Sequence, residues 1–140
     1  MLSTSNRITQ TFEELRQKAE TALIPYIMAG DPSLAETESL VLALEQAGAD
    51  LIELGVPFSD PIADGPVIQK AAERALLSGT SLRRILDTVK TLRAKTQIPL
   101  ILMTYYNTIM AMGEETFCQE LSLIHISEPT RRTPISYAVF

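Results

Sequence analysis

The chain has 140 residues, a length that suits one ordinary domain. Its composition, with 46% hydrophobic and 21% charged residues, is typical of a globular protein and argues against a disordered chain. The net charge of −5 disfavours a nucleic-acid partner, because phosphate binding requires a basic face.

Residues 6–20 place apolar side chains at helical spacing and predict an amphipathic helix. The apolar run "ALIPYIMAG" (22–30) predicts a strand, although Pro25 removes one donor from its ladder. Ser33 and Glu36 then form a capping-box pattern, which predicts a helix that begins there and ends near Gly48.

The run "ADLIELG" (49–55) predicts a second strand. Helices at 66–79 and 80–95, a third strand at 98–107 and a further helix at 113–121 follow it. Strands that alternate with helices in this way, and that are apolar almost throughout, predict an α/β fold with parallel strands. On this pattern alone, an open doubly wound sheet and a closed eight-stranded barrel both remain possible.

The composition also bears on the compartment. No apolar run approaches the length of a membrane helix, and the N-terminus lacks the pattern of a signal peptide. Cys118 is the single cysteine and cannot form an internal disulfide, so we expect a cytoplasmic protein. One histidine and one cysteine leave little for a zinc site.

The second predicted strand ends on an acid and runs into an acidic, proline-rich loop, "ELGVPFSDPIADGP" (53–66). Parallel α/β folds bind ligands at the carboxyl ends of their strands, where Glu53 lies, and a partly buried carboxyl group there suits proton transfer. Asp64 precedes the helix predicted at Pro66, whose N-terminal dipole favours a carboxylate. Two carboxylates at one cleft can divide the acid and base roles.

Structural explanations stand beside this chemical one. Asp60 and Asp64 could be ordinary turn and N-cap residues. Glu53 could pair with a buried lysine or arginine, because an ionised carboxylate on a buried strand face requires a partner. Three carboxylates could also hold a divalent metal, but their spacing matches no known ligand motif, so we expect no metal site.

The segment "ELGVPFSDPIADGPVIQ" resembles the signature of the tryptophan synthase α chain family, with "PYIMAGDPS" before it and "LMTYYN" after it. The resemblance runs from about residue 7 to about residue 120. It implies a (β/α)₈ TIM barrel, of which the first three strand–helix units are present. It also implies a lyase of tryptophan biosynthesis that cleaves indole-3-glycerol phosphate by a retro-aldol reaction, without a cofactor in this chain.

The resemblance also assigns roles to single residues. Glu53 matches the acid–base carboxylate, and Asp64 matches the carboxylate that holds the indole N–H. Tyr105 and Tyr26 match positions that line the indole pocket, although Tyr26 could equally be a simple core residue.

A partner subunit is implied as well. Pro57, Phe58 and Asp60 match the loop that faces the tryptophan synthase β chain, which holds pyridoxal phosphate in an αββα heterotetramer. This reading would explain an exposed Phe58 on a polar loop. The alternatives are a half-barrel module that only docks a β chain, and another phosphate-binding barrel with a different substrate.

The end of the chain departs from the family pattern. Residues 121–140, "LSLIHISEPTRRTPISYAVF", begin with a stretch that resembles translated sequencing-adapter sequence. We therefore expect 1–120 to be the N-terminal part of a TIM-barrel domain and 121–140 to be a non-native, unpacked tail. Because such a barrel needs about 250 residues, we expect the third strand to leave an unpaired edge and the chain by itself to be inactive.

Overall fold

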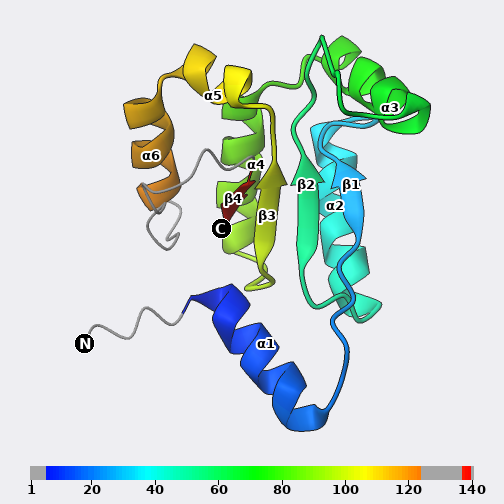
Figure 1. Ribbon diagram of the computed structural model, residues 1–140, viewed down its shortest axis with the longest axis vertical. Coiled ribbons are helices and arrows are strands. Elements are labelled where there is room, and N and C mark those ends of the chain that lie inside the picture. The colour runs from blue at the N-terminus through cyan, green and yellow to red at the C-terminus, as the bar shows by residue number, and fades with distance from the viewer. Residues whose placement is uncertain (1–5, 124–136, 140) are drawn as a thin grey trace.

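The computed structural model describes residues 6–123 and 137–139 (Figure 1). Its sheet has the strand order β1-β2-β3-β4, in which β1 (Tyr26–Met28), β2 (Ile52–Gly55) and β3 (Leu100–Met103) are parallel. This part of the fold confirms the α/β architecture with three parallel strands. The first strand is shorter than the sequence predicts, since Pro25 has no N–H to continue the ladder.

Three of the helices begin at a residue whose side chain caps them. In α2 (Leu34–Gln46) the Ser33 hydroxyl accepts the Glu36 N–H at 3.2 Å, as the capping-box pattern predicts. Helix α1 (Arg7–Lys18) is capped by Asn6, α4 (Leu82–Arg93) by Ser81, and α3 (Pro66–Leu77) starts on proline. Helices α5 (Tyr106–Met112) and α6 (Glu114–Leu123) follow β3.

The main core lies between one face of the sheet and helices α2 and α4, which stand behind the strands in Figure 1. Ile52 and Leu54 of β2 contribute to it, as the period-two alternation of a strand requires. The apolar stripe of α4 fills the other side and is almost fully buried: Leu82, Ile85, Leu86, Val89 and Leu92. This packing fixes which side chains of β2 point the opposite way.

The opposite face of the sheet, which we call the site face, carries Tyr26, Met28, Glu53, Ile101 and Met103. Tyr26 pairs with Glu53 across β1 and β2, and Glu53 pairs with Ile101 across β2 and β3. Met28 and Met103 flank Gly55 two residues further along. A row of large side chains therefore has a single gap at the glycine.

Two expectations about the third strand are wrong. The strand ends at Met103 rather than at residue 107, and Tyr105 is the N-cap residue, without a side-chain cap, of the unpredicted helix α5. The edge of β3 is also not unpaired, because β4 (Tyr137–Val139) pairs with it antiparallel. An edge of free N–H and C=O groups accepts any strand-forming segment within reach, and aromatic and β-branched residues such as those of "YAV" favour strands.

The pairing of β4 also corrects the expectation of an unpacked tail for residues 137–139. In a (β/α)₈ barrel the next strand would be parallel, so the antiparallel β4 is not a barrel strand in that position. Residues 124–136 and 140, which carry the rest of the predicted tail, lie outside the described residues. Leu121, at the start of the predicted tail, is buried in the main core.

Candidate active site

A cavity of about 310 Å³ opens at the carboxyl ends of the parallel strands. Its walls come from segments far apart in sequence: β1, the loop after β2, helix α3, and the end of β3 with the start of α5. The predicted site residues among the lining side chains are Tyr26, Phe58, Asp64 and Tyr105. Glu53, Pro57 and Asp60 are not part of the wall.

Asp64 and Tyr105 form the polar centre of this cavity. The Tyr105 hydroxyl donates to Asp64 Oδ2 at 3.3 Å and accepts the Ala63 N–H at 3.0 Å. Within the part of the chain that the structure describes, Oδ1 of Asp64 has no hydrogen-bond partner. The carboxylate is therefore oriented by one oxygen and can accept a ligand's N–H with the other.

Asp64 is held from the backbone side as well. Gln69 Nε2 donates to the Asp64 carbonyl at 2.7 Å, so the first turns of α3 tie down the end of the loop. The N-cap of α3 is Gly65, and it makes no side-chain cap. The alternative in which Asp64 caps the helix is thus not what the structure shows, and its side chain remains available to the cavity.

Glu53 lies deeper on the site face, half-buried in the middle of the ladder between Tyr26 and Ile101. Among residues 6–121, its carboxylate has no ion pair and no hydrogen bond. The alternative of a buried lysine or arginine partner therefore does not apply to the described residues. A half-buried, unpaired carboxylate beside a cavity is chemically available.

Tyr26 connects the two acids. Burial, followed by the charges of Asp64 and Glu53 and the proximity of Tyr105, raises the pKa of the Tyr26 hydroxyl to about 12. Its ring leans along the sheet over Gly55, where an added Cβ would lie 2.0 Å from the tyrosine oxygen. Tyr26 is thus a neighbour of both acids, since it pairs with Glu53 across β1 and β2 and lines the cavity together with Asp64.

Phe58 differs from its predicted exposure. Its ring is half-buried and stacks on the Tyr105 ring with centroids 5.0 Å apart and an interplanar angle of 29°. Stacking in this offset geometry supports the tyrosine that orients Asp64. Pro57 is buried, whereas Asp60 is exposed and accepts the Ser59 hydroxyl at 2.7 Å.

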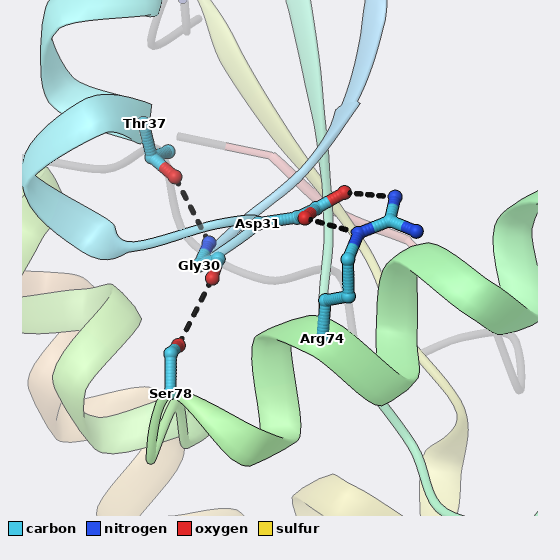
Figure 2. Close-up of polar contacts among 5 residues, drawn as sticks. All are labelled: Gly30, Asp31, Thr37, Arg74 and Ser78. Carbon is cyan, nitrogen blue, oxygen red and sulfur yellow. Dashed lines mark hydrogen bonds and ion pairs between the residues drawn. The ribbon is translucent and has the colours of Figure 1, made fainter.

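A polar clamp joins the loop after β1 to helices α2 and α3 (Figure 2). Arg74 of α3 donates two hydrogen bonds to the Asp31 carboxylate, at 2.8 and 2.7 Å, and these bonds hold the pKa of Asp31 below its usual value. Gly30 donates its N–H to Thr37 Oγ1 at 2.9 Å and accepts the Ser78 hydroxyl at 3.0 Å. The clamp fixes α3, and with it one wall of the cavity, against the end of β1.

Several lining residues were not predicted. Met28, Met103 and Thr104 belong to strand ends, and Ala72 of α3 lines the cavity facing them. The first three could have been expected from their position at strand ends, but no sequence pattern indicates that α3 packs against this cavity.

Within the described residues, no group of three or more histidine, cysteine or acidic side chains is placed to hold a metal ion. No helix in residues 6–123 or 137–139 is long and apolar enough to cross a membrane.

Comparison with known proteins places these features in a family. A family model for the tryptophan synthase alpha chain matches residues 12–128. The tryptophan synthase alpha chain of Geotalea daltonii is 60% identical over 114 residues, which cover 81% of this chain and 43% of that relative. That of Citrifermentans bemidjiense is 58% identical over 112 residues, or 80% of this chain and 42% of the relative.

Solved structures agree. Tryptophan synthase subunit alpha from Legionella pneumophila str. Paris aligns with a TM-score of 0.83 at 43% identity, over 86% of this chain and 47% of that one. The aminoacrylate-bound form of tryptophan synthase from M. tuberculosis aligns with a TM-score of 0.79 at 33% identity, over 86% of this chain and 49% of that one. The chain thus spans less than half the length of these relatives. With a family model that matches most of its residues, it belongs to the tryptophan synthase alpha chain family.

Proposed function

We propose that this chain carries the acid–base part of a lyase site that cleaves indole-3-glycerol phosphate into indole and glyceraldehyde 3-phosphate in tryptophan biosynthesis. The observation that supports this most is the cavity beyond the parallel strands, where Asp64 accepts the Tyr105 hydroxyl and Tyr26, the strand neighbour of Glu53, lines the same space. We further infer that β1, β2 and β3 are the first three strands of a (β/α)₈ barrel, since the aligned structures are alpha chains of this enzyme family.

The reaction moves protons and breaks one carbon–carbon bond. The glycerol hydroxyl next to the ring loses its proton and becomes the aldehyde, while C3 of the indole ring gains a proton as the bond to the side chain breaks. One proton is removed and one is added, and no oxidant, reductant or cofactor takes part. Glu53 is suited to the proton transfers, because it is half-buried and without a hydrogen bond among the described residues.

Asp64 has a different role in this proposal. Protonation of C3 places positive charge on the ring nitrogen, and a carboxylate that accepts the ring N–H stabilises that charge. Oδ1 of Asp64 is the group for this contact, since Oδ2 already accepts the Tyr105 hydroxyl. Phe58 and Tyr105 provide an aromatic wall against which a flat ring can stack.

Activity in this proposal requires more of the fold than this chain contains, because the matched segment is only 43% of the Geotalea daltonii relative. The test is indole release from indole-3-glycerol phosphate by two proteins. One is the chain itself, and the other is a hybrid in which residues 1–120 replace the matching segment of a full-length relative. We expect release from the hybrid and none from the chain alone. An inactive but folded hybrid would contradict the proposed reaction.

We also propose a tryptophan synthase β chain as partner, in an αββα assembly, with the pyridoxal phosphate in the β chain alone. Support comes from the exposed Asp60 and from similarity to solved tryptophan synthase structures. Because Phe58 is stacked inside this chain, Asp60 is the better contact of the loop. In the hybrid, Asp60→Ala should reduce activation by a β chain more than it reduces binding of indole-3-glycerol phosphate. Equal losses would argue against a role in subunit communication.

A further inference from the structure

The Tyr26 hydroxyl is a donor without a partner at the centre of the candidate site. It lines the 310 Å³ cavity together with Asp64 and Tyr105, and within the described residues it makes no hydrogen bond. Its oxygen is also not among the buried side-chain atoms that lack a partner, so the cavity leaves it accessible to a ligand.

The sheet holds this hydroxyl in place. Tyr26 pairs with Glu53 in the β1–β2 register, so their side chains lie next to each other on the site face. Gly55 lies two residues further on β2, and the Tyr26 ring occupies the space that any side chain at Gly55 would need. The ring consequently points from Glu53 toward the mouth of the cavity, where Asp64 lies.

The hydroxyl of Tyr26 stays protonated at physiological pH. Burial and the two carboxylates raise its pKa to about 12, so it is a neutral donor across the physiological pH range. It can donate a hydrogen bond to a ligand oxygen, which a carboxylate in its ionised form cannot do. A ligand oxygen placed near Glu53 therefore requires a donor that the carboxylates cannot supply.

We propose that the Tyr26 hydroxyl donates a hydrogen bond to a hydroxyl oxygen of the ligand's side chain, and that it selects ring compounds carrying a hydroxylated side chain over the bare ring. The proposal rests on the proposed function, because it takes an indole ring as the part of the ligand that Asp64 and Tyr105 hold. It adds a specificity-determining residue to the pair of carboxylates.

The experiment compares binding of two probes, indole and indoleglycerol, to the chain and to its Tyr26→Phe variant. The chain contains no tryptophan, so the fluorescence of either probe can be followed without interference. Tyr26→Phe removes one oxygen atom and keeps the ring over Gly55, and circular dichroism of the variant checks that the fold is retained. Indole, which has no oxygen, serves as the internal control for ring binding.

We expect Tyr26→Phe to weaken indoleglycerol binding by about three- to tenfold, the effect of one neutral hydrogen bond, and to leave indole binding unchanged. An equal loss for both probes would show that the ring alone matters and would overturn the proposal, as would no loss for either. If the wild-type chain bound neither probe, the ligand assignment under the proposed function would fail together with this inference.

Discussion

The two ends of the sheet differ in the sign of their unpaired charge. Toward the carboxyl end, Asp64 lines a cavity with one oxygen left for a ligand, and Glu53 lies deeper on the same face of the sheet, next to Tyr26. At the opposite end, beside which α1 lies in Figure 1, Arg93 is half-buried. Its Nη1 donates to the Ile98 carbonyl at 2.8 Å, but Nε and Nη2 are buried and lack partners among the described residues.

This difference distinguishes charged groups with a chemical role from charged groups with a structural role. Desolvation of an unpaired charge costs stability wherever it occurs, so such groups persist either for function or because the surrounding fold tolerates them. Asp64 lines a cavity that a substrate can enter, whereas Arg93 donates to the carbonyls of the turn before β3, at Thr96 and Ile98. We therefore expect substitutions at the first end to change activity, and substitutions at the second end to change only stability.

The largest contrast is expected between Glu53→Gln and Glu45→Gln in the hybrid protein. Glu53→Gln removes proton transfer with little change in volume, and should lower the rate of indole release by about 10²- to 10⁴-fold. Glu45 lies at the other end of the sheet, where its negative charge acts on Arg93. Its substitution should change the rate less than twofold. Steady-state kinetics of both variants decide this, and turnover retained by Glu53→Gln would remove Glu53 from the mechanism.

A smaller loss is expected for Asp64→Asn. The variant replaces a charge-assisted contact to the ring N–H by a weaker neutral one, so the rate should fall by about 10- to 100-fold. Asp60→Asn is the matched control, because Asp60 belongs to the same loop but is exposed. Without a β chain present, this control should keep the rate within twofold. Equal losses for the two variants would contradict the assignment of Asp64 to the ring.

The two ends should also respond oppositely to alkaline pH. Tyr26 has its pKa raised from 10.0 to about 12 on folding, so its contribution to stability is complete below pH 10 and is lost as the pH rises toward 12. Arg93 has its pKa lowered to about 10, mainly by burial, so its contribution is lost as the pH falls through 10 and grows above that value.

Urea unfolding at pH 9 and pH 11 can separate these effects. Between the two pH values, Tyr26→Phe should gain stability relative to the wild-type chain, whereas Arg93→Met should lose stability relative to it. The reason is that each variant removes one of the two opposing proton-linkage contributions. Parallel pH profiles for all three proteins would show that neither group is shifted as the structure implies.

The smallest effect is expected for the clamp in Figure 2. Arg74→Ala should lower the urea midpoint slightly at pH 7, because exposed ion pairs contribute little, and should speed hydrogen exchange at Ala63 and Asp64.

The effect of Arg74→Ala should also depend on pH. The pKa of Asp31 is held below its usual value, so the contribution of Asp31 to stability is present above about pH 4 and is lost as the pH falls further. The difference from wild type should therefore vanish near pH 2. Lys70→Ala, on the same helix, is the control, and a similar loss there would argue against the clamp.

Local sequence signals predicted most of the helices and the three parallel strands. The Ser33–Glu36 cap and the apolar stripe of α4 each depend on residues within a few positions of one another, which a sequence shows directly. Helix α5 was missed because "TYYN" follows an apolar strand without a polar cap, and the pairing of β4 with β3 depends on contacts distant in sequence.

The site was predictable in its residues but not in its contacts. The acidic stretch that begins in β2 identified Glu53 and Asp64: Asp64 lies in the loop beyond the carboxyl end of β2, whereas Glu53 lies inside the strand rather than at its end. The hydrogen bond that orients Asp64 comes from Tyr105, which is 41 residues away in the chain. Likewise, the contact of Tyr26 with Gly55 depends on the register of two strands, which no local pattern gives. These contacts decide which oxygens remain for a ligand.

Whether the carboxyl end of the sheet is the ligand site can be decided by a chemical-shift map of the ¹⁵N-labelled chain titrated with indole. We expect the largest shifts at the amides of Ala63, Asp64 and Tyr105, and none at Arg93 or Gln97. The largest shifts around Arg93, with none at Asp64 and Tyr105, would place the ligand at the other end of the sheet.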